Sequence, residues 1–344
     1  MLQRDVFINE ITKSLEKDKS IYFLSADFGA AALDSLRERF PNNFLHCGIS
    51  EQAMLDIASG LALEGNKVFA YAMAPFISLR SIEQTKCGAG LMNLPICIIS
   101  VGIGLGYADA GPTHYSTEDF ACFRSIVGSS IYTPADINTT KHIAKEMLEK
   151  PKFSYVRLDR EALPNLSPEI TIEDYKKGFK IFGNIDKNKI ALISHGKMSH
   201  KCLEISNKDP EKLFCVDIFR SKPFPKDLPK LISSCKGIVV VDEQSPSANL
   251  SSCVFEGFSN QNYFPKIISQ SLPEKYIFEN GGRIREITGF SKNTGFGASK
   301  KNRKLFLRTF RHRDTPGRVR GHAPLTLPGV SRCCCLRFFD FGLF

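Results

Sequence analysis

Two segments of this 344-residue chain place side chains capable of proton transfer where a helix or a loop begins. The first is Gly48-Ile49-Ser50-Glu51-Gln52, whose carboxylate falls in the first turn of a predicted helix. A negative charge at that position is stabilised by the helix dipole. The pattern therefore allows two interpretations: a simple helix-capping arrangement, or a carboxylate held for chemistry.

The second segment is Gly111-Pro112-Thr113-His114, followed by Glu118-Asp119, in a glycine-rich stretch beyond a predicted strand. A histidine in such a loop is either solvated surface or a group that exchanges protons near neutral pH. Asp109 lies in the same loop.

Two further segments supply an aromatic ring and cations. Ala74-Pro75-Phe76 opens a predicted helix, so Phe76 is either a core residue or a platform for stacking. Arg157 and Arg160 lie at the end of a predicted strand. Arginines in that position bind anions bidentately or pair with acidic neighbours.

Continuous apolar strands alternate with helices around these segments. The predicted strands include 21–25, 68–72, 96–101 and 154–158, and the predicted helices include 50–64, 76–91 and 137–148. Strands without polar alternation are typical of a parallel sheet covered on both faces. The pattern predicts an α/β fold in which each of two domains has a mostly parallel sheet flanked by helices.

The domain boundaries are predicted from where this pattern stops and restarts. Residues 1–163 form the first α/β domain, and the polar, proline-containing segment 164–178 is a linker. Residues 179–290 form a smaller α/β domain, with strands expected at 190–194, 214–218 and 238–242. Residues 291–344 form a basic tail, which we expect to be disordered.

Positive charge is concentrated in that tail. The formal net charge of the chain is +10, of which residues 300–344 contribute +9 and the rest +1. The tail is a basic arm for nucleic acid or a membrane surface, an extension with no defined role, or a segment foreign to the domain. A nearly neutral body gives no electrostatic footprint for a nucleic acid, so we expect no nucleic-acid partner.

The sequence predicts a cytoplasmic protein with no membrane segment. The N-terminus has no apolar stretch of signal-peptide length. The longest weakly polar run, 94–107, is shorter than the roughly 20 residues that a membrane helix needs. The eight cysteines before residue 300 show no metal-ligand spacing and fit a reducing compartment.

Taken together, the order of these motifs resembles the thiamine-diphosphate-dependent transketolase family, in particular its C-terminal half, over about residues 4–290. Ser25-Ala26-Asp27 is similar to a strand-ending motif of the family, Gly48–Gln52 to its GIAEQ motif, and Gly111–His114 to its GPTH loop. Leu272–Lys275 and Glu279–Gly282 resemble the closing segment of stand-alone C-terminal subunits. The resemblance implies a pyrimidine-binding domain followed by a transketolase C-terminal-like domain.

The resemblance also implies residue roles. Glu51 would hydrogen-bond the aminopyrimidine of the cofactor and shift it to the tautomer that activates the thiazolium, and Phe76 would stack on the ring. Ile49 would contact the cofactor. His114 would face the substrate and assist proton transfer. The residues expected to bind substrate are Arg4, Arg160, Asp109 and His114, whereas Arg157 would be structural.

The sequence contains no Gly-Asp-Gly motif of the kind that holds Mg²⁺ and the cofactor diphosphate in this family. The resemblance therefore implies a split enzyme. A separate N-terminal subunit would hold the diphosphate and Mg²⁺, and the complete sites would form in a heterotetramer acting on a sugar or sugar phosphate.

Departures from the family pattern keep other functions open. Ala110 stands where transketolases have Asp before the GPTH glycine, and Val101-Gly102 replaces a phosphate-contacting histidine. The leading hypothesis is transfer of a two-carbon ketol unit between sugars. The alternatives are a deoxyxylulose-phosphate synthase-like enzyme, a protein similar to the beta subunit of 2-oxo-acid dehydrogenases, and a non-catalytic homologue.

Overall fold

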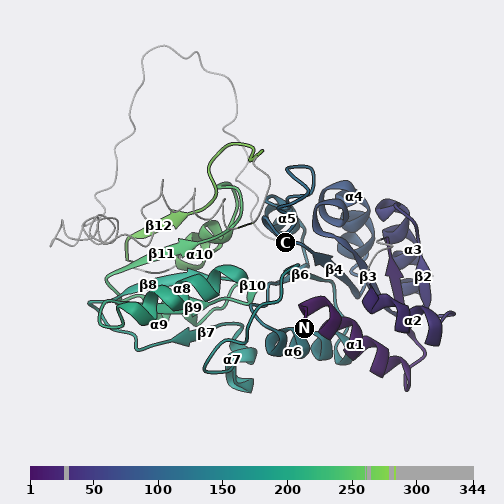
Figure 1. Ribbon diagram of the computed structural model, residues 1–344, viewed down its shortest axis with the longest axis horizontal. Coiled ribbons are helices and arrows are strands. Elements are labelled where there is room, and N and C mark those ends of the chain that lie inside the picture. The colour runs from purple at the N-terminus through teal and green to yellow at the C-terminus, as the bar shows by residue number, and fades with distance from the viewer. Residues whose placement is uncertain (27–30, 260, 262–264, 279–282, 284–344) are drawn as a thin grey trace, which may run out of the picture.

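The fold is described from a computed structural model, which covers residues 1–26, 31–259, 261, 265–278 and 283 (Figure 1). The predicted tail, Asp27 and the segment Glu279–Gly282 lie outside the described residues. Within them the chain forms two sheets, which lie at opposite ends of the long axis of the molecule.

The first sheet has seven strands in the order β10-β5-β6-β4-β3-β1-β2. Every pair in it is parallel except β10–β5, which is antiparallel. The strands are β1 (Ile21–Ser25), β2 (Phe44–His46), β3 (Lys67–Met73), β4 (Ile96–Val101), β5 (Ser130–Tyr132), β6 (Ser154–Leu158) and β10 (Arg220–Lys222). The central strands are buried over nearly their whole length, as their continuous apolar sequences predicted.

Helices cover both faces of this sheet. Helices α1 (Gln3–Leu15) and α6 (Ile137–Glu149) lie side by side on one face (Figure 1), where Phe7 and Ile143 share a buried cluster with Phe69. On the other face, Met54 of α3 (Glu51–Leu63) packs into a cluster with Ile98. The remaining helices of this unit are α2 (Asp34–Arg39), α4 (Ile82–Thr85) and α5 (Asp119–Ser125).

The second sheet has five strands in the order β12-β11-β8-β9-β7, and only β7–β9 is antiparallel. Its strands are β7 (Lys180–Phe182), β8 (Ile190–Ser194), β9 (Leu213–Asp217), β11 (Gly237–Val241) and β12 (Ile267–Gln270). The helices of this region are α7 (Ile172–Lys177), α8 (Lys197–Lys208), α9 (Leu228–Ile232) and α10 (Leu250–Phe258). The predicted fold class, two mostly parallel sheets flanked by helices, is confirmed.

Two local features differ from the predictions. The predicted linker contains α7, which begins with a capping box between Thr171 and Asp174. Strand β10 comes from the second sequence unit but pairs with the sheet of the first. The domain boundaries themselves stay a prediction, and β10 shows that the two units share structure across them.

The predicted helix 76–91 is interrupted. It consists of a π-helical turn η2 (Phe76–Arg80), the short α4 and a second π-helical segment η3 (Lys86–Leu91). Hydroxyl groups explain part of this irregularity, because Ser78 and Ser81 donate to carbonyls four residues earlier at 2.6 and 2.7 Å. Such bonds compete with the backbone ladder and bend helices. Turns of the π type are frequent at functional sites.

A buried ionic network joins the two units. Arg157 is completely buried, and its guanidinium donates to both carboxylate oxygens of Asp119 at 2.7 and 3.1 Å. It also approaches His195 in the second unit, whose Nε2 lies 3.0 Å from Asp242. Burial alone would lower the pKa of Arg157, but the Asp119 charge raises it above the usual value. The structural role expected of Arg157 agrees with this geometry.

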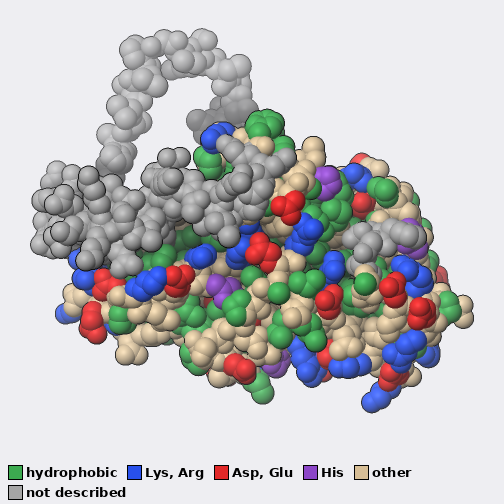
Figure 2. All heavy atoms as spheres, viewed as in Figure 1, with side chains coloured by type: hydrophobic (Ala, Val, Ile, Leu, Met, Phe, Trp, Pro, Cys, Tyr) green, Lys and Arg blue, Asp and Glu red, His purple; other side chains and the backbone are tan. Residues whose placement is uncertain are grey.

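Charge on the described surface is mixed. Figure 2 shows Lys and Arg interspersed with Asp and Glu over the face in view, in keeping with the small net charge of the body. Among the described residues, no helix is both long and apolar enough to cross a membrane.

The buried network yields a stability prediction. Asp119→Asn leaves the Arg157 charge buried without its counter-ion, and we expect a loss of about 3–5 kcal/mol in the free energy of unfolding. Urea denaturation followed by circular dichroism measures it. Glu173→Ala, which removes only an exposed pair with Lys177, is the control and should cost less than about 1 kcal/mol. Equal effects of the two substitutions would contradict the role of the network.

Candidate active site

The Glu51 carboxylate is the most buried charged group among the predicted site residues. Helix α3 begins at Glu51, and only 2% of this residue is exposed. Ser50 occupies the N-cap position but makes no capping hydrogen bond with its side chain. Instead of serving the helix end, the Glu51 Oε2 atom accepts a hydrogen bond from Arg80 Nη1 at 2.5 Å.

Arg80 also connects this carboxylate to the Phe76 ring. The Arg80 guanidinium carbon lies over the Phe76 ring, 4.5 Å from its centroid. Phe76 is half-buried, so its ring is partly available to another planar group. Phe76 is therefore not a fully buried core residue, and its role as a stacking platform stays a prediction.

His114 contacts the Phe76 ring. Its imidazole packs edge-to-face with Phe76, with ring centroids 5.3 Å apart and an interplanar angle of 75°. Thr113 Oγ1 lies 2.9 Å from His114 Nδ1. Among the described residues, no side chain or backbone group is a hydrogen-bond partner for His114 Nε2.

Close backbone contacts fix the loop that carries His114. Gly104 and Ser116 exchange two backbone hydrogen bonds of 2.9 and 2.8 Å across the base of the loop. Gly102 has a φ of +84°, which favours glycine, and a Cβ atom there would lie 2.0 Å from the Tyr107 ring. Tyr107 in turn contacts His114, with centroids 6.3 Å apart.

Arg160 and Asp109 extend the cluster. The Arg160 guanidinium lies 4.6 Å from the Tyr107 ring centroid, and its Nη1 is 4.0 Å from Asp109 Oδ2. Both side chains are exposed. The structure therefore links Glu51 to Phe76 through Arg80 and packs His114 against Phe76. Tyr107 links Arg160, and Asp109 beside it, to His114.

Arg4 and Ile49 are less closely connected. Arg4 pairs with Asp5 at 3.3 Å, and its neighbour Gln3 accepts a hydrogen bond from the Asp159 backbone at 2.8 Å. Burial alone would lower the pKa of Arg4, but Tyr71 and Asp5 raise it. Ile49 is 84% exposed. Arg4 thus lies near the strand end that carries Arg160, whereas Ile49 faces outward.

Sequence reasoning missed Arg80 and Tyr107. Arg80 lies four residues after Phe76 on one helical segment, a spacing that brings side chains together. That spacing was a usable signal for Arg80. Tyr107 had no local signal, because its contacts depend on how the 102–116 loop folds back.

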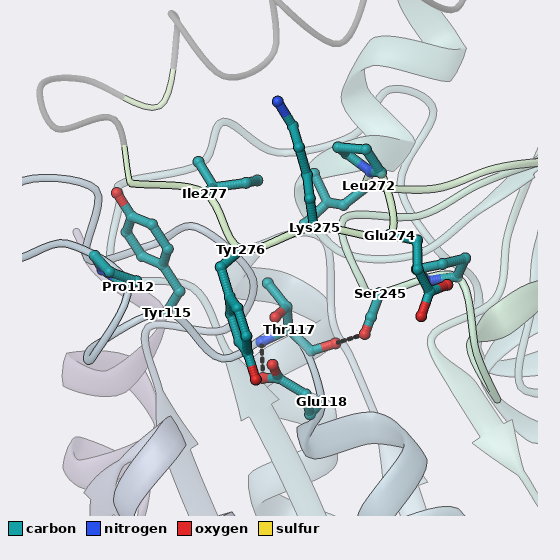
Figure 3. A pocket seen from close by; sticks show the side chains of 12 residues that line it. Pro112, Tyr115, Thr117, Glu118, Ser245, Leu272, Glu274, Lys275, Tyr276 and Ile277 are labelled. Atoms are coloured by element: carbon teal, nitrogen blue, oxygen red, sulfur yellow. Dashed lines mark hydrogen bonds between the residues drawn. The ribbon is translucent and has the colours of Figure 1, made fainter.

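A cavity lies beside the His114 loop but does not include the Glu51 cluster. It measures about 420 Å³ and lies between residues 112–118 of the loop, Ser245-Pro246 and the segment 272–277 (Figure 3). Its polar groups are engaged locally, since Glu118 Oε2 accepts from Thr117 N and Ser245 Oγ donates to Thr117 O. Glu51, Phe76 and His114 do not line it.

The chemical groups of Glu51 and Phe76 fit those of the aminopyrimidine ring of thiamine diphosphate. A shielded carboxylate is present for a ring nitrogen, and an aromatic ring lies beside it. No group of three or more metal-ligating side chains occurs in the part of the chain that the structure describes.

Comparisons with known proteins show which family the chain resembles. Residues 2–165 match the family described as transketolase, pyrimidine binding domain. One of the subunits of apulose-4-phosphate transketolase from Phocaeicola vulgatus is 28% identical over 294 residues, which is 84% of this chain and 93% of that protein. The putative transketolase C-terminal section of Methanocaldococcus jannaschii is 25% identical, covering 83% of this chain and 90% of that protein.

Solved structures show the same fold. A split-gene transketolase, described as an inactive beta4 tetramer, has a TM-score of 0.70 at 22% identity and covers 85% of this chain and 97% of its own. Transketolase of Campylobacter jejuni has a TM-score of 0.72 at 19% identity, and the match covers 89% of this chain but 46% of that one.

Residues 2–165 therefore match the pyrimidine-binding domain of transketolases, a class that implies dependence on thiamine diphosphate. The matches as a whole support a C-terminal subunit of a split transketolase.

The contact between Gly102 and Tyr107 yields a prediction about the loop. Gly102→Ala should displace the Tyr107 ring and shift the NMR resonances of His114. It should lower the free energy of unfolding by at least about 1 kcal/mol more than alanine costs at a glycine that has only a positive φ. Gly128→Ala is the matched control, since Gly128 has a φ of +81° and no atom within 4 Å of the added Cβ. Unchanged His114 resonances in Gly102→Ala would contradict the packing of this loop.

Proposed function

We propose that this chain supplies the pyrimidine half of the active site in a split transketolase-like enzyme, which transfers a two-carbon ketol unit between sugars. The observation that carries the proposal is the buried Glu51 carboxylate beside the Phe76 ring, with His114 on the edge of that ring. Thiamine diphosphate, when bound, supplies the carbon nucleophile that the protein lacks.

In this proposal Glu51 hydrogen-bonds a ring nitrogen of the cofactor. Its carboxylate is shielded from water, so a hydrogen bond from it to a ring nitrogen is not weakened by competing solvent. Phe76 orients the ring by stacking, which fixes the nitrogen relative to the carboxylate. Glu51 and Phe76 are therefore the cofactor-binding residues, and we include Ile49 because it is exposed and lies two residues before Glu51 in the chain.

His114 acts on the substrate side. With Nδ1 beside the Thr113 hydroxyl, Nε2 can donate a proton to, or accept one from, a substrate oxygen. Beyond it, Arg160 and Asp109 are positioned to bind hydroxyl or phosphate groups of a sugar, since both are exposed and lie on the Tyr107 side of His114. Arg4 would contribute from the start of α1.

A partner subunit completes the site. We propose that an N-terminal transketolase subunit holds the diphosphate and Mg²⁺, and that the two subunits form a heterotetramer in the cytoplasm. The description of a related split-gene protein as an inactive beta4 tetramer fits a partner requirement.

Exposed apolar side chains support a protein partner at the same place. Ile57 and Leu63 of α3 and Leu79, Leu91 and Met92 of the adjoining segment 76–92 are each between 43% and 74% exposed. Neighbouring exposed apolar residues are typical of an interaction surface.

The proposal predicts a loss of turnover in Glu51→Gln. Because Gln cannot share the proton as a carboxylate does, we expect ketol transfer to fall by about 10²–10⁴-fold when the variant is assayed with a diphosphate-binding partner protein. Glu64→Gln, at the exposed end of α3, is the control and should retain full activity. Unchanged turnover in Glu51→Gln would show that this carboxylate does not activate the cofactor.

The product distinguishes the reaction types. A transketolase-like enzyme yields a ketose extended by two carbons from a ketose donor, whereas a synthase-like enzyme releases carbon dioxide from a 2-oxo acid. Relatives of both kinds exist, since a deoxyxylulose-phosphate synthase of Magnetococcus marinus is 26% identical over 280 residues but matched over only 44% of its length.

A further inference from the structure

Arg80 contacts both groups that define the proposed cofactor site. Its Nη1 donates to Glu51 Oε2 at 2.5 Å, and its planar guanidinium lies over Phe76 at 4.5 Å from the ring centroid. One flat, hydrogen-bond-donating group therefore satisfies a buried carboxylate and covers an aromatic face at the same time.

An aminopyrimidine would need the same two contacts. It is flat, it carries an amino group and ring nitrogens, and in the proposed function it stacks on Phe76 and hydrogen-bonds Glu51. Arg80 cannot keep its present position while another planar ring occupies the same face of Phe76.

The two partners of the Arg80–Glu51 ion pair differ in their exposure to solvent. The Glu51 side chain is 3% exposed, whereas the Arg80 side chain is 39% exposed. A carboxylate out of water needs a partner, and losing that partner is costly. The guanidinium reaches it from the solvent side on a flexible stem, so it can leave more easily than the carboxylate.

The backbone at Arg80 is also unusual. Arg80 is the last residue of the π-helical turn η2, and Ser81 after it has φ −116° and ψ 25°, outside helical geometry. The turn that carries Phe76 therefore also carries Arg80 and ends there.

We propose, resting on the function proposed above, that Arg80 is an internal occupant of the pyrimidine site. In the chain without cofactor it neutralises Glu51 and covers Phe76. Cofactor binding displaces it, so Arg80 lowers the affinity of the site for a pyrimidine ring and is a positioning residue for Glu51.

The test compares binding of an uncharged probe. The full-length chain and its Arg80→Met variant are titrated with 4-amino-5-hydroxymethyl-2-methylpyrimidine, and binding is followed by ligand-observed NMR. We expect Arg80→Met to bind about tenfold more tightly, because the pyrimidine no longer competes with an ion pair and a cation–π contact. Adding Phe76→Ala to Arg80→Met should abolish the gain.

Two controls separate this effect from others. Lys86→Met removes an exposed charge at the start of the following π-helical segment η3 and should leave the affinity unchanged. Arg80→Lys keeps the charge but not the planar fork, and should give a smaller gain than Arg80→Met. Circular dichroism confirms that each variant is folded.

Equal or weaker binding by Arg80→Met, or no binding by any variant, would overturn the proposal. The turnover of Glu51→Gln reports separately on the proposed function. A gain in pyrimidine affinity with full turnover in Glu51→Gln would sustain the Arg80 inference and reject the catalytic role of Glu51.

Discussion

The structure depends on keeping one carboxylate out of water without leaving it unpaired. Glu51 begins α3, where the helix dipole favours a negative charge, yet it lies almost entirely beneath neighbouring side chains. Arg80 is the group that pairs with it in this chain. The proposed chemistry needs the same shielded carboxylate, so the constraint on folding and the proposed requirement for function concern one side chain.

The rest of the architecture positions what surrounds Glu51. Strand β3 leads to Phe76, and β4 leads to the loop that folds back through Gly104 and Ser116 to place His114 against that ring. The Arg157–Asp119 pair anchors α5 behind the loop and extends to the second unit through His195.

Much of this arrangement was predictable from local sequence. The strands at 21–25, 96–101, 154–158 and 190–194 occur where they were expected, because buried parallel strands are uniformly apolar. Motif spacing indicated Glu51, Phe76 and His114, which the structure brings together. The resemblance to transketolases, confirmed by the comparisons, supplied a chemical reason for their proximity.

Other features depend on contacts that no local pattern encodes. Strand β10 has three residues and is stabilised by pairing with β5, which lies far from it in the sequence. The π-helical turns follow from hydroxyl groups that bond backbone carbonyls, and the apolar spacing of 76–91 does not reveal them. Arg80 escaped prediction because an exposed arginine on a helix is ordinarily solvated, and only the fold shows that it reaches Glu51.

The central claim is that this chain holds half of a cofactor site. Isothermal titration of thiamine diphosphate with Mg²⁺ tests it most directly, first with the full-length chain alone and then with a diphosphate-binding transketolase subunit added. The account predicts weak or undetectable binding to the chain alone and tight binding to the mixture. Tight, Mg²⁺-dependent binding to the chain alone would contradict it.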